Sequence, residues 1–187
     1  MSAPGPLATP RLRLRQWSAA DRAPFAALNA DPEVMHHFPA PLTRAQSDAM
    51  ADRIEALIHA NGWGLWAADW LADGAPRFMG FVGLNAPTAT LPFNPCVEIG
   101  WRLARPFWGR GLATEAARLA LRAGFETLAL PEIVSFTVLG NQRSRAVMQR
   151  LGMRECPHEA FEHPSVPPGH PLRAHCLYRL PRAGWQG

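Results

Sequence analysis

The stretch EIGWRLARPFWGRGLATEAARLAL, residues 98–121, decides the fold of this chain. Its first part reads as a β-strand, its middle is a loop that contains Gly109 and Gly111, and its last part has the spacing of a helix. Glycine lets the backbone approach a ligand, and the first turn of the following helix offers unpaired N–H groups at the positive end of its dipole. The turn therefore suits a phosphate or pyrophosphate.

Two other interpretations of a Gly-x-Gly turn remain open at this point. The first is a plain connection between a strand and a helix, without a ligand. The second is a dinucleotide-binding fold, which calls for a third glycine where Thr114 stands and for an acidic residue at the end of the next strand. Glu132 begins its expected strand instead, and the motif comes late in the chain, so the sequence disfavours a nicotinamide enzyme.

Composition limits the classes of protein to consider. With 187 residues and 48% hydrophobic content, the chain fits one domain, which we expect over residues 10–182 between tails at 1–9 and 183–187. All 19 basic residues are arginines, so a Schiff-base lysine and a phosphate loop that ends in Gly-Lys-Ser/Thr are both excluded. The arginines are scattered rather than clustered, which disfavours nucleic-acid binding.

Cysteine usage and hydropathy indicate a cytoplasmic protein. The three cysteines, Cys96, Cys156 and Cys176, form no C-x-x-C pair and no even set, which disfavours a disulfide scaffold or a thiolate zinc site. The first ten residues lack the apolar core of a signal peptide, and no segment approaches the run of about 20 apolar residues that crosses a bilayer. We expect no membrane partner.

The rest of the chain predicts a mixed architecture of strands and helices without repeats. Residues 29–38 are expected to form a turn and a short helical piece, and the proline-rich segment 154–173 is expected to be irregular. The sequence DGAP at 73–76 is typical of a hairpin turn. Strands are expected near 11–17, 64–72, 77–84, 96–103, 132–139 and 174–180, and helices near 18–29, 43–60, 111–127 and 141–152.

At these motifs the sequence resembles the GNAT superfamily of acyl-CoA-dependent N-acetyltransferases, in particular the branch that acetylates the N-termini of ribosomal proteins. The loop WGRGLATEA at 108–116 is similar to that branch, although Trp108 stands where most of the superfamily has Gln or Arg. NQRSRAVMQRLGM at 141–153 and LNADPEVMHHF at 28–38 also resemble it. The resemblance covers about residues 9 to 180.

The resemblance implies an α+β fold with a central, mostly antiparallel twisted sheet of about seven strands, flanked by helices and splayed between strands four and five. It implies acetyl-CoA as cosubstrate, with no metal. The arm of acetyl-CoA would pair with the main chain of Ile99, Trp101 and Leu103. The remaining positions implied for the cofactor are Gly109, Arg110, Gly111, Leu112, Ala113, Thr114, Asn141 and Ser144, with Arg105 as a further source of charge.

Transfer of an acetyl group to an amine needs a base for the ammonium and a proton for the departing thiolate. Glu98 is our candidate base, with pairing to Arg102 as the alternative interpretation. Ser144 is our candidate for the thiol side, since the one tyrosine, Tyr178, lies outside the usual position. Asn141 and Ser144 also have the spacing of a helix cap, which remains the simpler interpretation.

The segment that bears His158, His163, His170 and His175 has no familiar zinc spacing. We expect it to line the acceptor side of the site, where a histidine is an alternative base. Glu115, in the first turn of its helix, is expected to stabilise the helix dipole rather than to act in catalysis.

The sequence thus predicts an N-acetyltransferase that moves an acetyl group from acetyl-CoA to a primary amine by direct attack. The acceptor is either a protein N-terminus or a small amine, and the protein is a monomer or a homodimer. The alternative is a module of the same fold that binds or senses coenzyme A without turnover.

Overall fold

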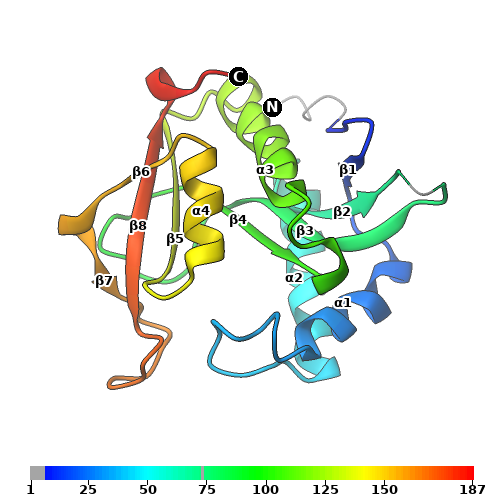
Figure 1. Ribbon diagram of the computed structural model, residues 1–187, viewed down its shortest axis with the longest axis horizontal. Helices are drawn as coiled ribbons and strands as arrows, with labels where there is room; N and C mark the ends of the chain where they lie inside the picture. The colour runs from blue at the N-terminus through cyan, green and yellow to red at the C-terminus, as the bar shows by residue number, and fades with distance from the viewer. Residues whose placement is uncertain (1–6, 73) are drawn as a thin grey trace.

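The computed structural model describes residues 7–72 and 74–187, and it contains one eight-stranded mixed sheet with helices on both faces (Figure 1). The strand order is β1-β2-β3-β4-β5-β8-β6, and β7 also pairs with β8. Every pairing is antiparallel except that of β4 with β5. The strands are β1 (Leu12–Arg15), β2 (Leu65–Trp70), β3 (Arg77–Asn85), β4 (Glu98–Leu103), β5 (Glu132–Val138), β6 (Arg154–Glu155), β7 (Phe161–Glu162) and β8 (Ala174–Pro181).

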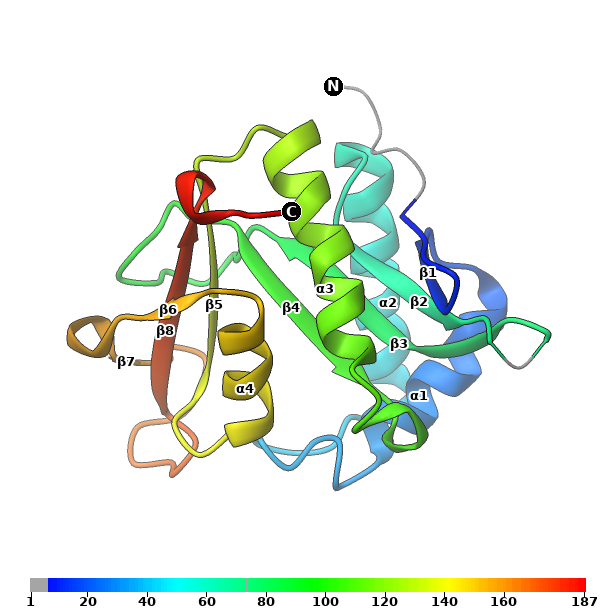
Figure 2. The ribbon, with the colours of Figure 1, turned by 45° about the horizontal axis from the view of Figure 1, so that its top comes forward.

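Four α-helices cover the sheet, with α1 and α2 on one face and α3 and α4 on the other (Figures 1 and 2). They are α1 (Arg22–Ala30), α2 (Arg44–Asn61), α3 (Leu112–Arg122) and α4 (Gln142–Arg150). Thr43 caps α2, because its hydroxyl accepts from the Gln46 N–H while the Gln46 side chain accepts from the Thr43 N–H. The predicted α+β class is confirmed.

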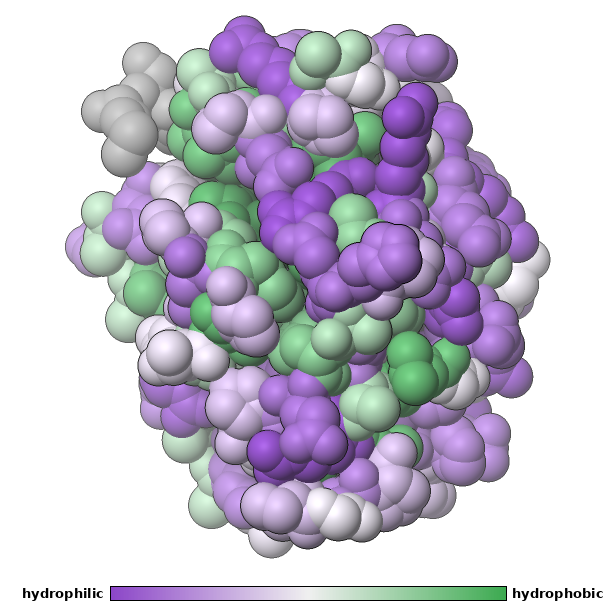
Figure 3. Space-filling view, turned by 90° about the vertical axis from the view of Figure 1, so that its left-hand side faces the viewer, coloured by the Kyte–Doolittle hydropathy of each residue, from purple (hydrophilic) through white to green (hydrophobic). Residues whose placement is uncertain are grey.

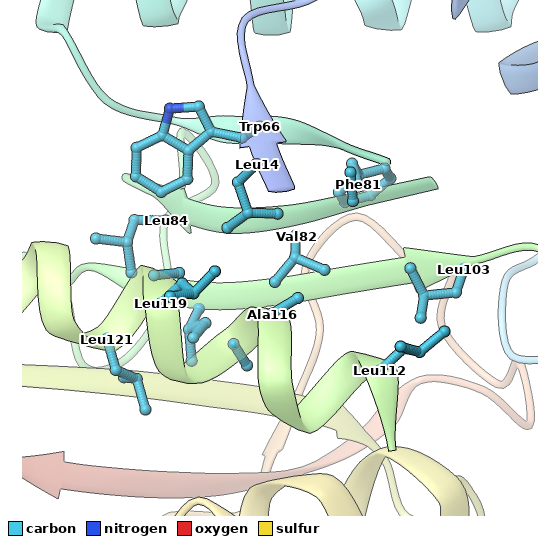
Figure 4. Close-up of a cluster of buried hydrophobic side chains, with 14 of the residues drawn as sticks. Leu14, Trp66, Phe81, Val82, Leu84, Leu103, Leu112, Ala116, Leu119 and Leu121 are labelled. Carbon is cyan, nitrogen blue, oxygen red and sulfur yellow. The ribbon is translucent and has the colours of Figure 1, made fainter. Parts of the chain in front are cut away.

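Helix α3 carries the core of the molecule. Leu112, Ala116 and Leu119 recur on one face of the helix and are buried. They lie against Val82 and Leu103 of the sheet, as Figure 4 shows. Burial of such side chains stabilises the fold by about 1.5–3 kcal/mol each, so the start of α3 is held firmly over the end of β4.

Strands β4 and β5 pair at one end and then separate. Their register contains a single pair, Glu98 with Val134, and the Val134 N–H donates to the Val97 carbonyl at 2.9 Å. Beyond this point the two ribbons diverge, as Figure 2 shows. The splay between strands four and five is therefore confirmed.

Two segments differ from the sequence-based expectation. Residues 32–37 form successive turns rather than a helix, and a helical-type bond joins the Met35 N–H to the Asp31 carbonyl. The segment 154–173 is not wholly irregular, because β6 and β7 each add two residues to β8. Pairing with a strand far along the chain overrides the low local propensity of such short runs.

Some residues that we assigned to the two tails contact the rest of the domain. Leu7 is buried and its carbonyl accepts from the Leu14 N–H, and Thr9 donates to Glu115. Residues 7 and 9 of the expected tail therefore contact the domain, and residues 1–6 lie outside the described part. Trp185, which we assigned to the C-terminal tail, packs against Phe125 with ring centroids 5.7 Å apart. The hairpin between β2 and β3 is confirmed, while Asp73 of its DGAP turn lies outside the described residues.

Within residues 7–72 and 74–187, none of the helices combines the length and the apolar content that crossing a bilayer requires.

Candidate active site

A cleft of about 1950 Å³ opens where β4 and β5 separate. Its walls come from β4, the glycine loop, the start of α3, the end of β5, the start of α4 and the turns at 33–39. The structure brings most of the sequence-predicted site residues to this one cleft. They are Glu98, Ile99, Trp101, Leu103, Gly109, Gly111, Leu112, Ala113, Thr114, Asn141 and Ser144.

The edge of β4 that faces β5 offers main-chain groups to the cleft. The Ala104 N–H donates to the Met79 carbonyl of β3. Because the main-chain groups of successive residues in a strand point to opposite neighbours, those of Ile99, Trp101 and Leu103 point away from β3 and toward β5. The Ile99 carbonyl accepts from the Ser135 hydroxyl at 2.9 Å, and the Leu103 carbonyl accepts from the Trp108 indole at 2.7 Å. The N–H and C=O of Trp101 lie between these two, where β5 no longer pairs with β4.

The two loop glycines are needed for their backbone conformation. Gly109 and Gly111 have φ values of 72° and 75°, in the left-handed region that favours glycine. A Cβ atom at Gly109 would meet nothing within 4 Å, and one at Gly111 would meet only the Arg11 guanidinium at 4.0 Å. The positive φ values alone therefore favour glycine at both positions, and close approach of the backbone to a ligand stays a prediction.

The first turn of α3 presents donors to the cleft. Glu115 is the first residue whose N–H bonds back within the helix, to the Gly111 carbonyl at 3.0 Å. The N–H groups of Leu112, Ala113 and Thr114 therefore have no intrahelical acceptor. They lie at the positive end of an 11-residue helix, which favours an anion. The Leu112 side chain is buried in the core, so only its main chain is available to a ligand.

An ion pair fixes this turn to the N-terminal strand region. Both Arg11 and Thr9 donate to the Glu115 carboxylate, and Arg11 also donates to the Arg110 carbonyl at 3.3 Å. Burial raises the pKa of Glu115, but the hydrogen bonds from Arg11 and Thr9 outweigh it and lower the pKa below its ordinary value. Glu115 thus anchors the loop, and no sequence signal pointed to Arg11 as its partner.

The predicted charges on the loop are placed differently from expectation. Arg110 does not line the cleft, because its guanidinium lies toward Trp70, 5.9 Å from the ring centre. Arg105 is bound to Asp31 at 2.6 Å. Arg143, which the sequence analysis missed, stacks on Trp108 at 4.4 Å and lines the cleft. Its guanidinium places a positive charge at the cleft.

The start of α4 forms part of the wall of the cleft. The Asn141 side chain accepts from the Ser144 N–H at 3.2 Å and donates to the Thr137 hydroxyl at 3.0 Å. Asn141 is therefore an N-cap that also ties α4 to β5. Ser144 is partly exposed and lines the cleft, so its hydroxyl is available to a ligand.

Glu98 lies at the point where the strands part. Burial raises its pKa to about 7, and a hydrogen bond with Asn85, its partner across β3 and β4, opposes the rise. Among the described residues it forms no ion pair with Arg102, whose guanidinium instead donates to Asn29 at 2.5 Å. A carboxylate that titrates near neutral pH is suited to accept a proton from an amine.

Two of the four loop histidines reach the cleft. His163 and His175 line it with ring centroids 5.0 Å apart, and burial lowers the pKa of both. They belong to an aromatic group with Phe93, Phe136 and Phe161. On the side of the molecule that carries β6, β7 and β8, hydrophobic surface near the middle is interspersed with hydrophilic surface (Figure 3). His158, His170 and the buried Tyr178 do not line the cleft.

Comparison with known proteins identifies similar chains. The family model described as an acetyltransferase (GNAT) domain matches residues 11–154. The FsC-acetyl coenzyme A-N(2)-transacetylase of Aspergillus fumigatus is 32% identical over 170 residues, which cover 87% of this chain and 71% of that protein.

Solved structures agree with this match. An acetyltransferase from Agrobacterium tumefaciens has a TM-score of 0.75 at 29% identity and covers 96% of both chains. A RimL ribosomal alpha-N-protein acetyltransferase, solved in complex with coenzyme A, has a TM-score of 0.74 and covers 95% of this chain and 98% of that one. Its identity of 15% shows a shared fold alone.

Proposed function

The chain belongs to the GNAT acetyltransferase family, and from this premise we propose that it moves an acetyl group from acetyl-CoA to a primary amine. The observation that carries the proposal is that one cleft contains both a site for an anion and a site for an ammonium group. The free N–H groups at the start of α3 and the carboxyl group of Glu98 both line it, the first suited to an anion and the second to an ammonium.

The residues of the cleft fit acetyl-CoA. The N–H groups of Leu112, Ala113 and Thr114 can donate to a diphosphate, and Arg143 adds a positive charge nearby. The exposed edge of β4 at Trp101 can pair with an extended amide-bearing arm, in the manner of an added strand. Acetyl-CoA would supply the reactive thioester.

Proton movement is assigned to two side chains. Glu98 takes a proton from the ammonium of the acceptor, since a pKa of about 7 leaves a substantial fraction of it ionised at neutral pH and makes it more basic than an ordinary carboxylate. Ser144 donates from Oγ to the departing thiolate, because it is the hydroxyl in the first turn of α4 and lines the cleft. Orientation of the two reactants supplies the larger part of the acceleration, about 7–11 kcal/mol in favourable cases.

Release of free thiol from acetyl-CoA, measured across a panel of amines and N-terminal peptides, tests this function. We expect saturable release with at least one primary amine. Saturable binding of coenzyme A with no release from any acceptor would contradict the enzyme and favour the sensing module.

Ser144→Ala is expected to lower turnover by about 10-fold while the affinity for coenzyme A changes less than twofold. The physical reason is that Ser144 serves the thiolate in the reaction, whereas the cap of α4 uses the Asn141 side chain and the main chain of Ser144. The measurement is kcat for thiol release together with coenzyme A titration by calorimetry. Wild-type turnover in this variant would reduce Ser144 to a surface residue of α4.

A further inference from the structure

Arg102 is a buried cation that the chemistry above does not use. Its side chain belongs to β4, on the same strand face as Glu98 and opposite to the face covered by α3. The residue is 9% exposed, and burial lowers its pKa to about 10. Burying a guanidinium is costly unless an anion or several hydrogen bonds compensate it.

The partners of Arg102 among the described residues are neutral. One terminal nitrogen donates to the Asn29 carbonyl oxygen, whose amide is held in place by Ser47 at 2.9 Å. The guanidinium also lies over the rings of Phe38 and Phe81, at 4.2 Å and 5.4 Å. Within residues 7–72 and 74–187 it forms no salt bridge, and its buried Nε–H has no hydrogen-bond partner.

The position of Arg102 points to the acceptor side of the cleft. It lines the main cleft together with Glu98 and Gly100, and it also lines an adjoining cavity of about 550 Å³ between the 35–42 turns and α2. Gly100 places no side chain between Glu98 and Arg102, and the strand rise separates their Cα atoms by about 13 Å. Phe38, which covers the guanidinium, is 40% exposed and lies on a turn.

We propose that Arg102 binds a carboxylate of the acceptor, so that the substrate is a primary amine that also carries a carboxylate several atoms away from the amine. The proposal rests on the function proposed above and specifies its substrate class. The guanidinium fork is suited to a carboxylate, because its parallel N–H donors match the two oxygens. The amine of the acceptor then lies near Glu98 and its carboxylate near Arg102, on either side of Gly100.

Matched acids and amides test this inference. The acceptors are γ-aminobutyrate and 6-aminohexanoate, each compared with its carboxamide, and peptides beginning Ser-Asp compared with peptides beginning Ser-Asn. For pairs that are acetylated, we expect kcat/KM of the wild-type protein to favour the acid by about 10- to 100-fold, as the loss of a charge-assisted hydrogen bond implies. Arg102→Met should abolish this preference, and Arg102→Lys should retain part of it.

The control is Arg44→Met, which removes an exposed arginine that lines neither the cleft nor the adjoining cavity and should keep the wild-type preference. The ratio of acid to amide is informative because a merely structural Arg102 would lower both rates equally. Equal kcat/KM for acid and amide in the wild-type protein would overturn the inference. Acetylation only of amines that lack a carboxylate would overturn it as well. In both cases the proposed function survives. Absence of thiol release from every amine would overturn the function and the inference together.

Discussion

Ala113→Glu is expected to abolish coenzyme A binding, with a loss of affinity of about 100-fold or more. Ala113 is the second residue of α3, it is partly exposed, and it lines the cleft beside the unpaired N–H groups of the first turn. A carboxylate there would repel a diphosphate, and contacts between like charges cost several kcal/mol, of which each 1.4 kcal/mol is tenfold in affinity. Calorimetric titration with coenzyme A measures the effect.

Ala45→Glu is the matched control for this experiment. Ala45 is the second residue of α2, as Ala113 is of α3, and it is exposed outside the cleft. An acidic residue in the first turn of a helix is favourable, so neither variant should unfold. Wild-type affinity in Ala113→Glu would remove the start of α3 from the cofactor site.

Glu98→Gln is expected to lower kcat by about 100-fold or more and to remove the pH dependence near neutrality. The pKa of Glu98 is about 7, so the residue is protonated below this pH and cannot accept a proton. In the wild-type protein kcat/KM should therefore rise as the pH increases through 7 and then level off. An alkylamine acceptor is suitable for the measurement, because its own titration near pH 10 lies well outside this range.

Glu132→Gln is the control, since Glu132 begins β5 as Glu98 begins β4 but does not line the cleft. In this variant kcat/KM should still rise as the pH increases through 7. If kcat/KM of Glu98→Gln also rises through pH 7, Glu98 is not the base. His163 or His175, which line the same cleft, is then the next candidate.

Local patterns in the sequence predicted much of the fold and most of the cleft. The capping pair Thr43 and Gln46 marks the start of α2, and the glycines mark the start of α3, because each signal concerns neighbouring residues. Glu98 and Ser144, which the sequence analysis assigned to one site, both line a single cleft.

What the sequence did not predict depends on contacts between distant segments. Arg11 and Glu115 are 104 residues apart, and Arg102 and Asn29 are 73 residues apart, so no local pattern links them. The direction of the Arg110 side chain, toward Trp70 of a distant strand, was not predictable for the same reason. Periodicity specifies elements, whereas such pairs depend on how the elements pack.

A crystal structure of the protein with coenzyme A tests the central claim most directly. We predict that the diphosphate accepts hydrogen bonds from the N–H groups at the start of α3, around Ala113, and that the arm of the cofactor pairs with the main chain of Trp101. Phosphates bound elsewhere, with the first turn of α3 left to solvent, would contradict the account.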